Sequence, residues 1–269
     1  MKICLPVATS KTQYFINQAY TKYISECGFE PVLVTHENDA IKVAEQCDGL
    51  LLPGGIDLDP IFYGEDNIAS YTSDPIMDDY QRQLLYAFIG QNKKIFGICR
   101  GFQLIVREFL HHNEEFEQEL VYYQEFPGHS IASKLSVLRS QPTHRIKYKP
   151  NLLYGEKDNK VRDLFVNSMH HQAIMTEGMT TKKKVKITYG QLTIAGWTEK
   201  GVDDKEDGYV IEAVVIDSGG GIKAVQWHPE EMMDTALLIS FFGDKKEDAP
   251  QAETPESDTS PEDITETGD

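Results

Sequence analysis

The sequence predicts an α/β fold: a single domain with a mostly parallel central sheet flanked by helices. Short apolar runs alternate with amphipathic helical stripes through the first half of the chain. Such alternation is typical of a parallel sheet with helices on both faces. Two of the runs end in a glycine-containing turn, at Gly54-Gly55 and at Cys99. Ligands of open parallel sheets bind beyond the carboxyl ends of the strands, so these turns are expected to border the functional site.

The first half of the chain is expected to alternate strand and helix. The apolar run Ile3–Ala8 suits a buried strand. From Tyr14 to Cys27 apolar residues recur at three- and four-residue steps, which predicts a helix that Gly28 ends. The strands expected next are Pro31–Val34, Asp48–Leu52 and Lys94–Ile98. The helices expected between and after them are Asp39–Gln46, Asp78–Ile89 and a stripe from Phe102 to Phe109.

The second half has shorter strand-like runs and ends in an acidic tail. The runs are Ile146–Tyr148, Lys184–Thr188, Leu192–Trp197, Glu212–Asp217 and Ile222–Gln226. Residues 244–269 hold ten Asp or Glu against two Lys, a net −8 of the −17 carried by the 269-residue chain. A segment with so little apolar surface cannot repay the entropy of ordering. We therefore predict a folded domain over 1–243 and a disordered acidic tail over 244–269.

Charge and cysteine usage limit the partners and the compartment. Nucleic acids are disfavoured partners because a protein must supply cations to release their counterions. The four cysteines stand singly, which is typical of a reducing compartment. No apolar run is long enough to span a membrane, and the N-terminal segment lacks a secretory apolar core. We expect a cytoplasmic protein with neither nucleic acid nor membrane as partner.

The segment Gly97-Ile98-Cys99-Arg100-Gly101 has the spacing of a nucleophile elbow with cysteine as the nucleophile. An expected strand enters the turn and an expected helix leaves it. Glycines two residues to either side permit a very tight turn, and the helix N-terminus favours the thiolate. A buried cysteine between two glycines is the alternative that this motif alone leaves open.

A thiolate nucleophile needs a base, and the base needs an orienting group. After the expected strand Ile222–Gln226 stands Trp227-His228-Pro229-Glu230. Residues two apart on an extended backbone share a side, so His228 and Glu230 are expected to project together. Glu230 would then hold the imidazole that accepts the proton of Cys99. A surface turn after a strand is the alternative reading of His-Pro-Glu.

Four ordered segments resemble the class I glutamine amidotransferase family, most closely its branch of γ-glutamyl-γ-aminobutyrate hydrolase-like enzymes, peptidase C26. They are Asp48–Glu65, Ile95–Leu104, Val166–Ile174 and Ala224–Glu230. The resemblance implies a flavodoxin-like core and a glutamine amidotransferase-like catalytic domain over residues 1–243. It also implies that Cys99 is the nucleophile, His228 the general base and acid, and Glu230 the residue that orients His228.

The resemblance extends to the substrate groups. It implies an oxyanion hole of backbone amides at Gly54, Gly55 and Arg100, with Gln103 in contact with the glutamyl group. It further implies that a loop grips the α-amino and α-carboxylate ends of that group, and the loop residues are Ser168, Met169, His170, His171 and Gln172. The sequence departs from the family where Arg-Asp with a later Glu is usual, since Met77-Asp78 and Gln81 stand there. It departs again at Val106 and at Phe109–His112, where the family carries an Asn and a Gly-Gly pair.

The implied reaction is cleavage of a γ-glutamyl amide through a γ-glutamyl thioester, releasing glutamate and ammonia or an amine. One alternative is a glutaminase subunit that delivers ammonia to a separate synthetase or transferase partner. A non-catalytic binding protein on the same fold is another. No cofactor is expected, because the chain lacks a Walker-type lysine loop and its Gly219–Gly221 run lacks a dinucleotide-site context. No metal is expected at His170-His171, since neighbours on an extended segment point oppositely.

Overall fold

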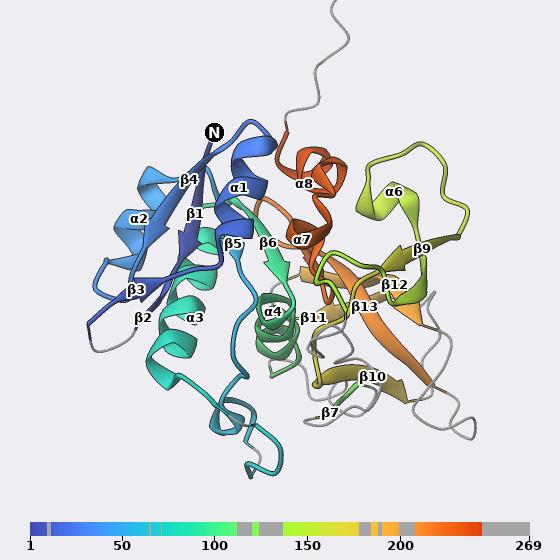
Figure 1. Ribbon diagram of the computed structural model, residues 1–269, viewed down its shortest axis with the longest axis horizontal. Helices are drawn as coiled ribbons and strands as arrows, with labels where there is room; N and C mark the ends of the chain where they lie inside the picture. Colours follow the sequence, from blue (N-terminus) through green and yellow to red (C-terminus); the bar gives the residue numbers. More distant parts are fainter. Residues whose placement is uncertain are drawn as a thin grey trace, which may run out of the picture.

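The computed structural model describes residues 1–9, 12–64, 66–70, 72–111, 120–123, 137–177, 184–187, 190–198 and 208–243. Its core is one large mixed sheet, with the parallel strands and the antiparallel strands side by side (Figure 1). The expected tail 244–269 lies outside the described residues. No helix among the described residues is long and apolar enough to cross a membrane.

The parallel half of the sheet confirms the predicted architecture. In spatial order its strands are β4 (Glu30–Val34), β1 (Lys2–Pro6), β5 (Gly49–Leu52), β6 (Lys94–Ile98) and β14 (Ile222–Val225). Each neighbouring pair is parallel. Numbered along the chain, this is the order 2-1-3-4-5 of flavodoxin-like sheets, in which ligands bind where the strand order reverses or the strands end.

The sheet continues beyond β14 as an antiparallel half. In order it comprises β13 (Gly208–Asp217), β12 (Gly190–Thr198), β8 (His144–Tyr148) and β9 (Arg162–Val166). Strand β10 (Ala173–Glu177) pairs with β13 and with β7 (Leu120–Tyr123), and β11 (Lys184–Ile187) pairs with β12. The short runs expected in the second half are therefore strands, and each is longer or shorter than expected by a few residues.

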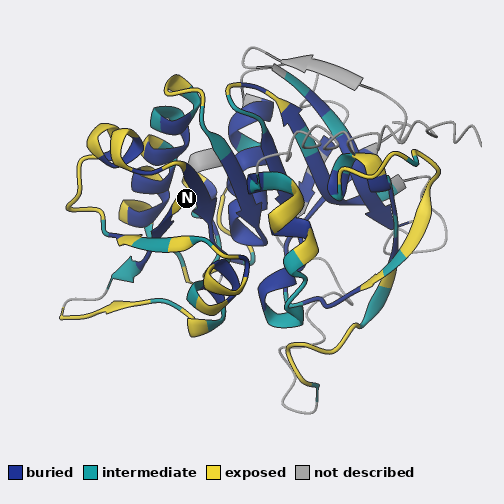
Figure 2. Ribbon diagram, turned by 90° about the horizontal axis from the view of Figure 1, so that it is seen from above, coloured by how far each residue is buried: buried dark blue, intermediate teal, exposed yellow. Residues whose placement is uncertain are grey.

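Helices cover both faces of the parallel half, as predicted. On one face lie α2 (Ala40–Gln46), α3 (Pro75–Gly90) and α4 (Arg100–His111), and on the other α1 (Gln18–Glu26) and α8 (Thr235–Phe242). Alternate residues of one strand enter the two cores: Leu50 and Leu52 face α3 and α4, whereas Leu51 faces α1 and α8. Figure 2 shows the central strands as almost continuously buried. Three short helices, η1 (Pro60–Tyr63), α6 (Pro150–Leu153) and α7 (Pro229–Met232), lie in connections.

The N-terminal segment differs from the expected strand and helix. The first strand ends at Pro6, and the chain then forms a hairpin of β2 (Ala8–Thr9) and β3 (Tyr14–Phe15). Helix α1 begins only at Gln18, because the side chain of Asn17 accepts the Ala19 N–H at 3.0 Å and caps it. The apolar residues at 14 and 15 that seemed to extend the helical stripe belong instead to the hairpin, which borders the site described next.

Candidate active site

Cys99 occupies a tight turn between β6 and α4. Its backbone has φ of +51°, a left-handed conformation that costs a non-glycine residue energy and is concentrated at functional sites. The Cys99 N–H donates to the carbonyl of Val225 on β14 at 2.8 Å, which holds the turn against the neighbouring strand. The Cys99 side chain is 6% exposed and lines a cavity. Strand, strained cysteine and helix follow one another as the elbow pattern predicts.

His228 and Glu230 are in contact, although the backbone that joins them differs from the expected one. The Nδ1–H of His228 donates to Oε1 of Glu230 at 2.6 Å, and both side chains are buried. The prediction of an extended segment was wrong: β14 ends at Val225, and His228 precedes the first turn of α7. Pro229 is the first helical residue, a position where its fixed φ suits helix initiation. The helical turn, rather than strand alternation, brings the two side chains together.

The charge of His228 is governed by its two neighbours. Burial by itself lowers the pKa of His228, but the negative charges of Glu230 and Cys99 raise the pKa to about 10. The imidazole is therefore protonated at neutral pH. An imidazolium beside a carboxylate and the sulfur of Cys99 can donate a proton to a leaving group.

Asn167 holds the backbone of His228 on both sides. Its Oδ1 accepts the His228 N–H at 2.9 Å and its Nδ2 donates to the His228 carbonyl at 3.1 Å. The same Nδ2 donates to the carbonyl of Arg139 at 2.7 Å. Asn167 is fully buried, so these bonds are made without competition from water. Sequence reasoning did not single out Asn167, although it lies inside one of the four matching segments.

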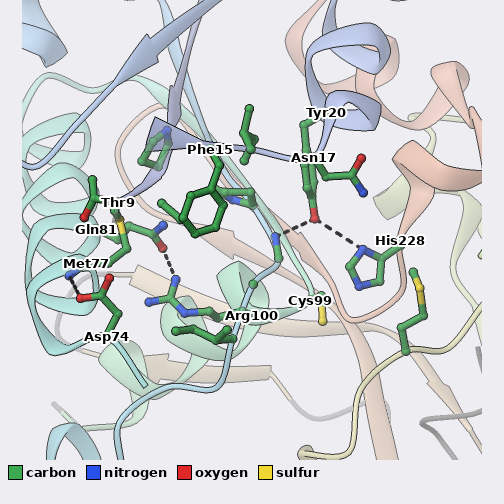
Figure 3. A pocket seen from close by; sticks show the side chains of 18 of the residues that line it. Thr9, Phe15, Asn17, Tyr20, Asp74, Met77, Gln81, Cys99, Arg100 and His228 are labelled. Carbon is green, nitrogen blue, oxygen red and sulfur yellow. Dashed lines mark hydrogen bonds between the residues drawn. The ribbon is translucent and has the colours of Figure 1, made fainter. Parts of the chain in front are cut away.

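Tyr20 on α1 joins the Gly54 turn to His228. The hydroxyl of Tyr20 accepts the Gly54 N–H at 2.8 Å and lies 3.4 Å from Nδ1 of His228 (Figure 3). Burial and the charge of Glu230 raise the pKa of Tyr20 well above its ordinary range, so the hydroxyl stays protonated. A Cβ on Gly54 would lie 2.7 Å from the Tyr20 oxygen and 2.8 Å from Cε1 of His228, which only glycine avoids. Tyr20 was also missed, because it lies 34 residues from Gly54 in the sequence.

A cavity of about 410 Å³ opens beside Cys99 and His228. Its walls come from the β2–β3 hairpin, the start of α1, the turn after β5 and the start of α3 (Figure 3). Six residues predicted for the site line this cavity, and they are Gly54, Gly55, Cys99, Arg100, Met169 and His228. The structure thus gathers the predicted reacting groups at one end of the parallel strands.

Two other residues predicted to bind substrate, Gln103 and Gln172, lie in a buried polar network outside the cavity lining. Nε2 of Gln103 donates to Oε1 of Gln226 at 3.3 Å and to the carbonyl of Gln172 at 3.4 Å. The Gln172 side chain in turn donates to the hydroxyl of Ser70 at 2.9 Å and accepts from the hydroxyl of Tyr122. Gln103 is thus hydrogen-bonded to Gln172, and neither side chain lines the cavity beside Cys99.

The remaining loop residues point in different directions. Nδ1 of His170 lies 2.7 Å from the carbonyl of Gln172, whereas Nε2 of His171 lies 2.9 Å from a carboxylate oxygen of Asp57. Ser168 is fully buried. In the part of the chain that the structure describes, no three His, Cys, Asp or Glu side chains are grouped so that they could hold a metal ion.

The departure at Gln81 and the neighbouring Asp78, which matches the family pattern, meet at one residue. The buried guanidinium of Arg100 donates to the carboxylate of Asp78 and to the side-chain oxygen of Gln81, both on α3. Arg100 is therefore hydrogen-bonded to one carboxylate and one neutral amide on α3. The departures at Val106 and Phe109 are accommodated differently, since both side chains are buried in the apolar core under α4.

Known proteins resemble the chain over most of its length. A family model described as Peptidase C26 matches residues 5–230. The glutamine amidotransferase-like protein YvdE of Lactococcus lactis is 31% identical over 70% of this chain and 68% of its own. The γ-glutamyl-γ-aminobutyrate hydrolase PuuD of Escherichia coli is 25% identical over 80% of this chain and 78% of its own. The glutaminase domain of Trypanosoma brucei CTPS has a TM-score of 0.51 at 15% identity, covering 89% of this chain and 91% of that one, a likeness of fold alone.

Proposed function

Because the chain belongs to the peptidase C26 family of class I glutamine amidotransferases, we propose that it hydrolyses γ-glutamyl amides through a thioester on Cys99. The family is one of amide-hydrolysing enzymes. The observation that carries the proposal is the contact of His228 with Glu230 beside a cysteine in a left-handed turn. A nucleophile, a base and an orienting group in this order suffice for nucleophilic catalysis of acyl transfer.

The first half-reaction forms the thioester. The Cys99 thiolate attacks the γ-carbonyl carbon, and the carbonyl electron pair moves onto oxygen. The tetrahedral intermediate then collapses, the C–N bond breaks, and the His228 imidazolium gives its proton to the departing nitrogen. Since the pKa of His228 is about 10, the imidazole holds this proton when the substrate arrives. Glu230 keeps the ring in place by accepting from Nδ1.

The second half-reaction uses the same histidine as a base. The neutral imidazole removes a proton from water, and the resulting oxygen nucleophile attacks the thioester carbon. The C–S bond then breaks, which regenerates the Cys99 thiolate and releases glutamate. Each step leaves His228 in the protonation state that the next step requires.

Backbone amides around Cys99 supply the oxyanion hole in this proposal. The Gly54 N–H is engaged by the Tyr20 hydroxyl, so Gly55 is the donor that we assign on this side. The N–H of Arg100, at the start of α4, is the second donor. Removal of one oxyanion-hole donor typically lowers kcat by about 10²–10³-fold. The glutamyl end is assigned to Gln103 and the 168–172 loop, whose buried polar network must open toward Cys99 to receive it.

The test is release of glutamate by the purified chain from glutamine and from γ-glutamyl amines, with Cys99→Ser as the matched control. Release that depends on Cys99 supports a hydrolase that acts alone. Absence of release from every amide would overturn that proposal. It would leave the glutaminase-subunit alternative, which predicts that a synthetase or transferase partner restores activity.

A further inference from the structure

The cavity beside Cys99 is too large and too apolar to serve ammonia alone. Its volume of about 410 Å³ falls in the range of pockets that bury organic ligands. Ammonia is close in size to water, which occupies roughly 30 Å³ in the liquid. Resting on the function proposed above, we propose that this cavity binds the leaving amine of the substrate and selects an uncharged amine with an apolar body.

The wall that faces the cavity is mostly hydrocarbon. Phe15 and Ile16 enter from the hairpin and the turn before α1, Ile56 from the turn after β5, Met77 from α3, and Met169 from the 168–172 loop. Phe15 is 57% exposed and Ile56 46% exposed, so large apolar side chains stand open to water at the mouth. An apolar ligand group would cover them and gain the free energy of removing both surfaces from water.

The charged side chains Arg139, Arg100 and Asp74 of the wall already have hydrogen-bond partners. Nε of Arg139 lies 2.6 Å from Oε1 of Glu231, which also accepts from Nδ2 of Asn17 at 2.8 Å. Arg100 is paired with Asp78. The carboxylate of Asp74 accepts the Met77 N–H at 3.2 Å and caps α3. A terminal carboxylate or ammonium on the amine would compete with these pairings, whereas an uncharged group leaves them in place.

The glutamyl group is a poor occupant of the same cavity. It carries an ammonium and a carboxylate, and a buried zwitterion needs several hydrogen-bond partners of both kinds. Gln103 and Gln172, which the resemblance assigns to the glutamyl group, belong to the buried network outside the cavity lining. Cys99 and His228 lie at the cavity wall, so an amide carbon at Cys99 can direct its nitrogen substituent into the cavity. The cavity therefore fits the amine side of the scissile bond.

The experiment compares γ-glutamyl amides that differ only in the amine. The probes are glutamine, the methylamide, the n-butylamide, and two amides of the same chain length that end in a carboxylate or an ammonium. Each methylene accepted by an apolar pocket typically raises kcat/KM by roughly tenfold or more. The n-butylamide is expected to exceed glutamine and both charged amides by at least about tenfold.

Phe15→Ala tests the cavity wall, with Tyr14→Ala as its matched control. The two residues are neighbours on β3 and about equally exposed (57% and 55%), but Phe15 lines the cavity and Tyr14 is outside its lining. Phe15→Ala is expected to lower kcat/KM for the n-butylamide by roughly tenfold more than it lowers kcat/KM for glutamine. Tyr14→Ala is expected to change neither. Binding of the n-butylamide to the Cys99→Ala variant, measured by calorimetry, should weaken in the same way when Phe15→Ala is added.

The possible failures are distinguishable. Turnover of glutamine that equals or exceeds turnover of the n-butylamide overturns the cavity assignment and leaves the hydrolase proposal standing. Preference for the carboxylate-ended or ammonium-ended amide overturns the uncharged specificity, as does an equal effect of Phe15→Ala on all substrates. No release of glutamate from any probe overturns the hydrolase proposal itself, and the cavity assignment falls with it.

Discussion

A Cβ atom on Gly101 would lie 2.2 Å from the carbonyl oxygen of Leu52. Gly101 is the second residue of α4, the helix that follows Cys99, and Leu52 is the last residue of β5, the strand that leads to the Gly54–Gly55 turn. The turn at Cys99 and the turn at Gly54–Gly55 thus pack against each other with no space for a side chain between their backbones. Glycine is required at position 101 by this contact between the start of α4 and the end of β5.

Gly101→Ala is expected to destabilise the fold and to displace Cys99. Overpacking a closed backbone contact costs about 1–3 kcal/mol, because the neighbour is a carbonyl that cannot rotate away. Gly90→Ala, at the end of α3 where a Cβ meets no atom within 4 Å, is the control and is expected to be neutral or slightly stabilising. Thermal denaturation and the rate of iodoacetamide labelling of Cys99 would measure both effects. Equal stability of the two variants would contradict this account of the elbow.

Tyr20→Phe is expected to lower kcat more than it changes KM. The substitution removes the hydroxyl that accepts the Gly54 N–H and touches His228, leaving a buried amide without its partner. Such a loss costs about 1–3 kcal/mol. Tyr23→Phe is the control on the same helix, since its hydroxyl donates to the carbonyl of Asp234. We expect a similar loss of stability in both variants but a loss of kcat only for Tyr20→Phe; an equal fall in kcat would reduce Tyr20 to a structural role.

The alkaline limb of the pH profile is expected to report His228. The raised pKa of about 10 means that the imidazole loses its proton only as the pH rises through that value. The leaving amine then lacks a proton donor, so kcat/KM should fall above about pH 10. Glu230→Gln removes the negative charge that raises the His228 pKa most and should move this limb to lower pH, measured as kcat/KM against pH. A limb that stays in place would show that another group controls it.

Stability should rise with pH where Lys223 loses its proton in the folded protein. The ammonium of Lys223 is buried, donates to the carbonyl of Leu153 and lies 5.2 Å from the centre of the Phe241 ring. Burial lowers the pKa of Lys223 from 10.5 to about 7. Between these values the unfolded chain binds a proton that the folded chain has released, so the free energy of unfolding increases with pH in this window.

Lys223→Met tests this linkage by chemical denaturation at several pH values between about 7 and 10. The free energy of unfolding of the variant minus that of the wild type should decrease as pH rises, because only the wild type gains from deprotonation. Lys42→Met, at an exposed position of α2, is the control and should follow the wild type. A constant difference for Lys223→Met across this range would contradict the assignment.

Local patterns in the sequence were enough to predict the parallel half of the sheet and the nucleophile elbow. Strand Lys94–Ile98 was predicted with its observed bounds, because the apolar run and the tight turn that follows it mark where the strand ends. The pairing of His228 with Glu230 was also predicted, for a reason that the structure corrects. Residues two apart lie on the same side of a strand and can also meet in the first turn of a helix. The contact could therefore be predicted from the sequence even though the backbone conformation was not.

Only the tertiary structure decided what surrounds these residues. Tyr20 reaches His228 across 208 residues, and Asn167 reaches it across 61. The hairpin that brings Phe15 to the cavity interrupts a pattern that seemed helical. Phe15 pairs with Ala8, and Asn17 caps α1, so the helix begins later than the spacing of apolar residues suggested. Composition and residue spacing indicate which secondary structure each segment can form by itself. Which side chains share a hydrogen bond or a cavity wall depends on how strands far apart in the chain are ordered in the sheet, and no local pattern contains that order.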